Sequence, residues 1–389
     1  MSLILSADEQ ALRDSVRRFV ADRSPLTAVR ELIAAGEPYD LAVWKQLAAQ
    51  LGVAGLTIPE EYGGAGAGHA AMAVALQELG AGLVPSPLLA SAVLAAGTLL
   101  RLDDEAARRD LLPGIASGEL VATLAITGGA GGKDAAGGLG AAGGAVRAAG
   151  TGAQVTLTGE LAPVLNGAQA DVLLVPADAG VGVGVGVYLV DAGARGLTRV
   201  ALTAADPTRA LARIRLDDTP ARALAGDGAS ALAAAADLAN LALAAEQCGA
   251  MAACLAMTTE YAKLRVAFGQ PIGAFQGVKH RLADMETAWE LAHATLRAAA
   301  RSADEEPGSF AADACVARIM ISGPYFTAAA DTIQLHGGIG FTWEHDAHLY
   351  YKNALSGQVL LGGPGDQLDR LAATLDAVDA VDAVDARGV

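Results

Sequence analysis

The strongest constraint on the fold is a change of residue pattern along the chain, from helical spacing to short β-like runs and back. Between residues 1 and 120 apolar residues recur at helical spacing, and a capping box at Ser6 and Glu9 marks the first helix start. From 121 to 222 the chain consists of short valine- and leucine-rich runs separated by glycines. Long helical stretches return between 223 and 375. We therefore expect an α+β protein with an N-terminal helical domain, a middle β-barrel or sandwich, and a C-terminal bundle of long helices.

The last residues form an acidic tail with its own pattern. Between residues 376 and 389 Asp, Ala and Val recur every three residues, a period that matches neither a helix nor a strand. A strongly acidic segment with few large apolar residues buries little surface, so we predict that this tail is disordered.

Composition excludes several kinds of partner and compartment. The 389 residues carry a formal net charge of -16, which argues against nucleic acid or an anionic membrane surface as a partner. The N-terminus has no basic segment followed by an apolar run, and the alanine-rich stretches carry charges, so we expect neither a signal peptide nor a membrane span. Three scattered cysteines on apolar helical patterns predict reduced core thiols and a cytoplasmic protein.

Two motifs in the C-terminal third carry the most chemical information. The first is RVAFGQPIGAFQ at 265–276, and the second is QLHGGIGFT at 334–342. An arginine can pair with a pyrophosphate as a charge-assisted fork, and amides with a glycine backbone can hold an adenine. The alternative is a solvated arginine at a helix end and a glycine helix cap. The candidate cofactor-binding residues in these motifs are Arg265, Phe268, Gln276, Gln334, Gly337 and Gly338.

In this order and spacing the two motifs resemble the flavin-binding signatures of the acyl-CoA dehydrogenase family. Agreement extends over nearly the whole chain, including Ile58-Pro59-Glu60 and Glu78-Leu79-Gly80. Within the family the chain is similar to the actinobacterial branch that handles bulky thioesters such as those of sterols. The resemblance implies FAD as cofactor, an acyl-CoA substrate, an electron-transfer flavoprotein as electron acceptor and a C-terminal four-helix bundle. It also implies a dimer or tetramer in which the two motifs reach the neighbouring subunit's FAD.

The family residues that would hold the flavin ring within the same chain are altered. The family motif Thr-Glu-Pro-Gly-Ala-Gly-Ser-Asp corresponds to TGGAGGKD at 127–134, where the resemblance implies that Thr127 bonds the flavin edge. The motif's serine is missing, with Gly132 and Lys133 in its neighbourhood, and the family's tryptophan aligns near Pro163. The chain therefore keeps the residues that would contact the FAD of a neighbouring subunit. The residues that would hold its own flavin are altered.

The catalytic base is also altered. Family members remove an α-proton with a carboxylate and pass a β-hydride to the flavin. One family location of the base falls on 360–362 and the other on 239–240, and neither has a carboxylate. Glu246 lies seven residues beyond 239, about 10 Å along the same face of the helix, in an apolar run expected to raise its pKa. Glu246 is the candidate catalytic residue, with a structural glutamate as the alternative; Asp366 is more consistent with a helix cap, and no residue set suggests a metal.

Two main hypotheses follow. In the first, the chain is an active FAD-dependent acyl-CoA dehydrogenase that converts an acyl-CoA to the 2-enoyl-CoA, with Glu246 as base. In the second, it is a catalytically impaired partner subunit that completes a sister chain's FAD site. A flavin monooxygenase on the same fold, which needs no base for an α-proton, is a weaker third hypothesis.

Overall fold

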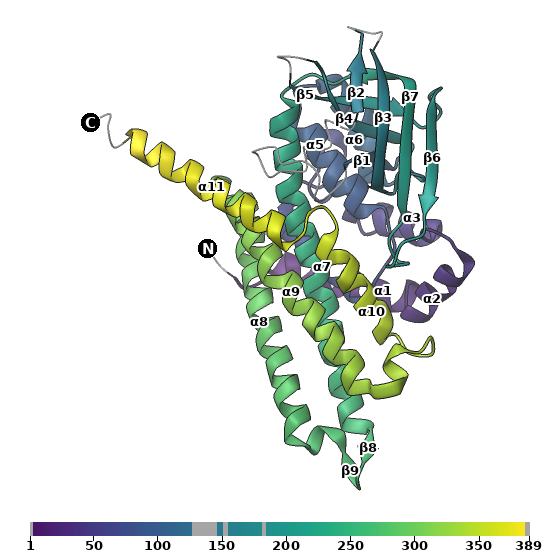
Figure 1. Ribbon diagram of the computed structural model, residues 1–389, viewed down its shortest axis with the longest axis vertical. Helices are drawn as coiled ribbons and strands as arrows, with labels where there is room; N and C mark the ends of the chain where they lie inside the picture. The colour runs from purple at the N-terminus through teal and green to yellow at the C-terminus, as the bar shows by residue number, and fades with distance from the viewer. Residues whose placement is uncertain (1–2, 127–145, 151–154, 181–183, 386–389) are drawn as a thin grey trace.

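A computed structural model describes residues 3–126, 146–150, 155–180 and 184–385 (Figure 1). The strands gather at one end of the molecule, and long helices run from them towards the opposite end. This arrangement confirms the predicted α+β fold, with an N-terminal helical domain, a middle β domain and a C-terminal helical domain. Thr127 and the rest of the 127–134 motif lie outside the described residues.

The N-terminal domain is helical, as its apolar spacing predicts. The capping box is confirmed: the Ser6 hydroxyl accepts from the Glu9 N–H, and the Glu9 carboxylate accepts from the Ser6 N–H at 2.7 Å. Its elements are α1 (Ala7–Arg23), α2 (Leu26–Ala35), α3 (Leu41–Ala49), η1 (Val53–Gly55), η2 (Glu60–Tyr62), α4 (Gly68–Ala81), η3 (Leu89–Ala95), α5 (Ala96–Arg101) and α6 (Glu105–Ser117).

The middle domain is a closed barrel with two flanking strands. The strands are β1 (Ala122–Leu124), β2 (Val146–Ala149), β3 (Val155–Leu165), β4 (Val172–Asp178), β5 (Val185–Asp191), β6 (Leu197–Leu202) and β7 (Leu211–Ala223). The pairings run β4–β2–β3–β7–β5 and return to β4, whereas β1 pairs with β4 and β6 pairs with β7. Alternate side chains of β7 (Ala212, Ile214 and Leu216) point into the barrel core, in agreement with their period of two in the sequence.

The C-terminal domain is built around α7. Its elements are α7 (Gly228–Leu264), β8 (Val266–Ala267), β9 (Gln270–Pro271), η5 (Ile272–Ala274), α8 (Gln276–Glu305), α9 (Phe310–His336), η6 (Gly337–Phe341), α10 (Ala347–Val359) and α11 (Pro364–Asp385). Helix α7 packs on α4, α8 and α9. By length and composition alone α7 is apolar enough to cross a membrane, but 78% of its most apolar window is buried inside the protein. Its apolarity is accounted for by this central position.

Glycines let α4 and α7 cross with their backbones in contact. A Cβ on Gly249 would lie 1.8 Å from the Gln77 carbonyl oxygen, and one on Gly80 would lie 2.1 Å from the Glu246 carbonyl oxygen. Only glycine allows so close an approach. The small residues Gly249 on α7 and Gly80 on α4 therefore serve helix packing.

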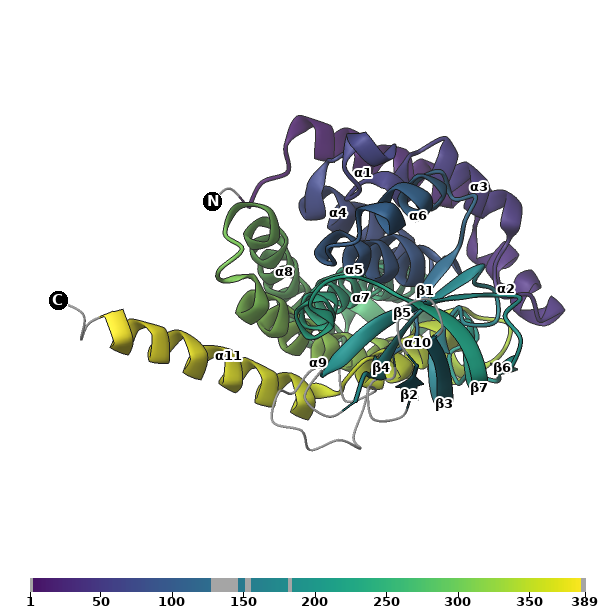
Figure 2. The ribbon, with the colours of Figure 1, turned by 90° about the horizontal axis from the view of Figure 1, so that it is seen from above.

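The prediction of a disordered tail from residue 376 is wrong for most of that segment. Helix α11 continues to Asp385 and stands apart from the body of the molecule in both views (Figures 1 and 2). The repeat contains alanine, the strongest helix former, and neither Gly nor Pro interrupts it before Asp385. These local preferences favour a helix even though the apolar residues do not form a helical stripe.

Candidate active site

The two cofactor-binding motifs meet at the end of the helical domain that is remote from the barrel (Figure 1). Arg265 caps the C-terminus of α7, and the β8–β9 hairpin turns at Phe268, whose φ is +53°. Gln276 is the first residue of α8. Gln334 lies in the last turn of α9, and Gly337 ends that helix with a φ of +66°.

A contact between α7 and α9 brings the two motifs together. The rings of Tyr261 and His336 stack with centroids 4.3 Å apart, and the Tyr261 hydroxyl donates to the His336 carbonyl at 3.3 Å. Tyr261 is one helical turn before Arg265, and His336 directly precedes Gly337. His336 therefore has a packing and hydrogen-bonding role at the base of the motif.

The polar side chains of this end have no partner within the described part of the chain. Arg265, Gln276 and Gln334 are exposed, and among the described residues no hydrogen bond or ion pair engages their side chains. A Cβ placed on Gly338 would meet nothing within 4 Å. An exposed guanidinium, two exposed amides and an open glycine backbone fit a pyrophosphate and adenine presented by another subunit.

Large exposed apolar side chains flank these polar groups in the sequence. The exposed residues, here called the distal patch, are Leu264, Val266, Phe268, Ile339, Phe341 and Trp343. Phe268 is 97% exposed and Phe341 is 70% exposed. Exposed large apolar side chains from two neighbouring motifs are typical of a protein–protein interface.

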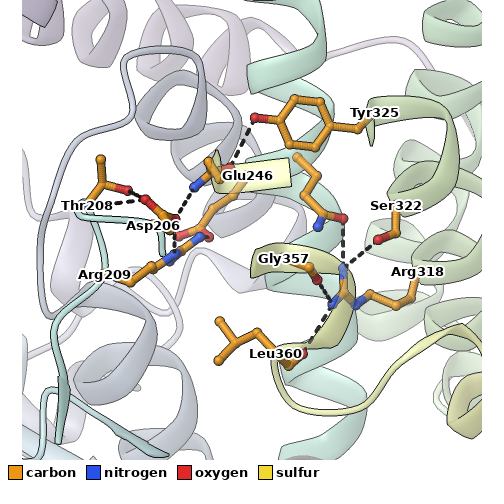
Figure 3. Close-up of polar contacts among 11 residues, drawn as sticks. Asp206, Thr208, Arg209, Glu246, Arg318, Ser322, Tyr325, Gly357 and Leu360 are labelled. Carbon is orange, nitrogen blue, oxygen red and sulfur yellow. Dashed lines mark hydrogen bonds and ion pairs between the residues drawn. The ribbon is translucent and has the colours of Figure 1, made fainter. Parts of the chain in front are cut away.

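The first family location of the base is occupied by neutral side chains and lies against a buried arginine. The turn after α10, where one family base is expected, has Leu360 and Leu361 buried at 7% and 5% exposure. Arg318 on α9 is 2% exposed and donates to the carbonyls of Gly357 and Leu360, as Figure 3 shows. Burial lowers the pKa of Arg318 to about 10, so this buried side chain remains a cation at neutral pH. A buried cation thus holds the turn where relatives would place a carboxylate.

The second family location of the base is also closed. Asn240 on α7 is 2% exposed, and its amide donates to the Gln367 side chain on α11 at 2.7 Å. Asp366, the further candidate, accepts from the Gly363 N–H at 2.8 Å and caps α11, as the sequence favours. Asn240 has no carboxylate, and the carboxylate of Asp366 is engaged in capping the helix.

Glu246 lies in an ion-pair network between the barrel and the helices (Figure 3). It forms an ion pair with Arg209, from the segment between β6 and β7, and the two side chains are 14% and 16% exposed. Asp206, fully buried, lies 3.8 Å from Arg209 and accepts from the Asn353 amide at 2.9 Å. Tyr325 donates to Asn353 at 3.1 Å and so ties α9 to the same network.

This environment differs from the apolar one expected for Glu246. Burial by itself would lower the pKa of Arg209, but the adjacent Glu246 carboxylate outweighs it and raises that pKa. A crevice above the pair is lined by Gly80, Leu83 and Asn353. Because Arg209 holds the carboxylate of Glu246, the geometry favours the structural alternative, and the catalytic role of Glu246 stays a prediction.

Arg209 and Arg318 were not among the site residues expected from the sequence. Arg209 lies 37 residues before Glu246 in a segment without periodicity, and nothing local marks it as a partner. Arg318 had a detectable signal, since a single arginine within the apolar sequence of α9 predicts a buried cation that needs several acceptors.

Comparison with known proteins identifies the family. The model of the acyl-CoA dehydrogenase N-terminal domain matches residues 6–119, and the model of the C-terminal domain matches residues 226–375. The acyl-CoA dehydrogenase IpdE2 of Mycobacterium tuberculosis is 36% identical over 367 residues, covering 94% of this chain and 96% of that protein.

Solved structures give the same result. The ChsE4–ChsE5 complex from Mycobacterium tuberculosis has a chain 30% identical to this one, with a TM-score of 0.87 over 97% of this chain and 99% of that chain. A Tcur3481–Tcur3483 steroid ACAD variant is 31% identical, with a TM-score of 0.85 over 96% of this chain and 99% of that chain. The chain belongs to the acyl-CoA dehydrogenase family of oxidoreductases.

Proposed function

We propose that this chain is the partner subunit of a heteromeric acyl-CoA dehydrogenase and completes the FAD site of a sister subunit. The sister chain supplies the catalytic carboxylate and the pocket for the flavin ring. The complex dehydrogenates a bulky acyl-CoA thioester of steroid origin to the 2-enoyl-CoA. It acts in the cytoplasm and passes its electrons to an electron-transfer flavoprotein.

The observation that carries this proposal is the contrast between the two halves of the site. The side chains of Arg265, Gln276 and Gln334 are exposed and have no partner among the described residues, at the end of the helical domain that is remote from the barrel. At the two family positions for the base, buried Leu360 and Asn240 stand in hydrogen-bonded surroundings without a carboxylate. A subunit that only completes a neighbour's FAD site would keep the exposed cofactor-binding residues. It would not need a carboxylate of its own to abstract the α-proton.

The names of the relatives support an assembly of unlike subunits. One solved relative is a complex of ChsE4 with ChsE5, and another is a steroid ACAD named for two chains, Tcur3481 and Tcur3483. Both are at least 30% identical to this chain. We therefore favour a heterotetramer over a homodimer or homotetramer.

Each residue of the exposed end has a task in this assembly. FAD accepts the hydride from the substrate when it is bound. Arg265 pairs with the pyrophosphate, whereas Gln276, Gln334 and the Gly338 backbone hold the adenine side. The distal patch buries its apolar side chains against the sister chain and excludes water from these charged hydrogen bonds.

The second candidate is an active dehydrogenase with its own FAD and with Glu246 as base. One observation favours it, because Glu246 lines a crevice between the barrel and the helices. It requires Arg209 to release the carboxylate during turnover. A purified chain that binds FAD and is bleached by an acyl-CoA without any partner would establish this candidate instead.

Co-expression with a sister acyl-CoA dehydrogenase chain tests the proposal. We expect the two chains to co-purify with FAD and Arg265→Ala to lower the FAD content of the complex at least about tenfold, because a charge-assisted pair is lost. Arg195→Ala, at an exposed arginine in the turn between β5 and β6, is the matched control and should change nothing. Full FAD retention by the Arg265→Ala complex would refute the role of this surface.

A further inference from the structure

A second cavity lies apart from the Glu246 crevice, where the N-terminal domain meets the helical domain. It is enclosed by α4, α5, α7 and the turn from α8 to α9, which neighbour one another in Figure 2. Its volume is about 190 Å³. None of the residues discussed above as flavin or base positions lines it.

The walls of the cavity are mostly apolar. Met72 and Leu238 are buried at 3% and 8% exposure, Phe310 at 9%, and all three line it. An apolar cavity of about 150 Å³ in a protein stays dry and admits benzene. The space therefore fits a six-membered ring or a branched hydrocarbon of similar size.

His69 places one polar group in this apolar wall. Its ring stacks on Phe310 with centroids 6.3 Å apart, and among the described residues no hydrogen bond reaches either imidazole nitrogen. Burial lowers the pKa of His69, although nearby Asp304 opposes this shift, so the imidazole is neutral at neutral pH. A neutral imidazole offers one donor and one acceptor to a ligand.

Arg101 and Asp237 are the oppositely charged residues of the lining. Arg101, at the end of α5, is exposed, and the described part of the chain gives its guanidinium no hydrogen bond or ion pair. Asp237 also lines the cavity, but Arg370 donates to its carboxylate at 2.6 Å. Burial raises the pKa of Asp237, and the positive charges of Arg370 and Arg101 oppose that shift. Because Arg370 holds the carboxylate, the Arg101 guanidinium keeps its hydrogen-bond donors for a ligand.

We propose that this cavity binds a small hydrophobic monocarboxylate, with its hydrocarbon body against Met72, Leu238 and Phe310 and its carboxylate on Arg101. A single guanidinium matches a carboxylate with two parallel hydrogen bonds. His69 donates a further hydrogen bond to the ligand carboxylate. A phosphate ester would need more donors than one arginine and one imidazole supply.

Methyl NMR on the chain alone tests the proposal without reference to the dehydrogenase reaction. In a sample labelled with ¹³C-methyl methionine, titration with cyclohexanecarboxylate should shift the Met72 signal. The signal of Met320, which is 44% exposed on α9 and does not line the cavity, should stay in place. A ligand of about nine heavy atoms is expected to saturate with a Kd of roughly 0.1–1 mM.

Two variants separate the contribution of charge from that of shape. Arg101→Gln should weaken cyclohexanecarboxylate binding at least about tenfold, whereas Arg195→Gln should not. Ala311→Leu fills the cavity and should abolish the Met72 response. Ala312→Leu, at the next residue of α9 and outside the lining, controls for the effect of the added bulk on folding.

Two further probes fix the ligand class. Cyclohexylmethanol should bind at least about tenfold more weakly than the acid, and cyclohexylmethylamine should not bind because it meets Arg101 with a like charge. The proposal is overturned if no probe moves the Met72 signal, or if acid and alcohol bind equally. It is also overturned if the Met72 signal responds to a cyclohexanecarboxyl-CoA thioester but not to the free acid.

Discussion

The substitution Glu246→Gln separates the structural from the catalytic role of this residue. It keeps the size of the side chain but leaves the Arg209 guanidinium without its main partner. Removing one member of a buried ion pair costs about 3–5 kcal/mol. The side chains retain 14% and 16% exposure and Asp206 lies 3.8 Å from Arg209, so the expected loss falls to about 2 kcal/mol.

Thermal unfolding and steady-state kinetics of the reconstituted complex measure the two roles together. In a chain of this size a loss of about 2 kcal/mol should lower the melting temperature by roughly 2 °C. Turnover of the complex should change less than about threefold, because the sister chain supplies the base. The control is Glu160→Gln, which breaks an exposed pair with Arg213 at 3.4 Å and should cost less than about 1 kcal/mol.

The result that refutes this reasoning is the reverse pattern. If Glu246→Gln leaves the melting temperature unchanged and reduces turnover by about 10²–10⁴-fold, Glu246 is the general base of an active chain. A double-mutant cycle with Arg209→Met gives a further check, because the two residues should show a coupling of about 2 kcal/mol if the pair is structural.

Two further predictions concern packing and pH. Gly249→Ala should destabilise the chain by about 1–3 kcal/mol in denaturant unfolding, because its Cβ would lie 1.8 Å from the Gln77 carbonyl. Gly277→Ala, at an open position in the first turn of α8, should be neutral or stabilising, and equal effects of the two would contradict the close crossing. Burial raises the pKa of both Cys248 and Cys254 to about 12. These thiols ionise more readily in the unfolded chain, so the free energy of unfolding should fall as pH rises from about 9 towards 12. Both thiols should also resist a disulfide reagent at pH 8 in the native protein. Rapid reaction of either thiol would contradict their burial.

The sequence predicts the architecture well because the architecture depends on local patterns. Helical spacing and the capping box at Ser6 locate the helices, and the period of two around Ile214 locates a core strand. Strands β2 and β6 give the weakest signal in the sequence, because β6 lies on β7 outside the closed ring of strands and has half-exposed side chains, whereas β2 is only four residues long. Short or half-exposed strands give a weak apolar pattern.

The site is predicted only where it depends on contiguous motifs. Arg265 and Gly338 lie within ordered motifs, and the structure brings these two motifs to one end of the helical domain. The surroundings of Glu246 could not be predicted in the same way, because Arg209 comes from the barrel and meets it through tertiary packing. An apolar stretch of sequence gives no information about a charge supplied by a distant segment, and such a charge decides how a buried carboxylate behaves.

The most direct test of the central claim is the FAD content of the chain, measured by visible absorption after purification alone and after co-purification with a sister chain. The account predicts a colourless chain that does not take up FAD on reconstitution. It also predicts a yellow complex with one FAD for each pair of unlike subunits, bleached anaerobically by an acyl-CoA. One FAD per chain in the protein purified alone, bleached by an acyl-CoA, would contradict the account.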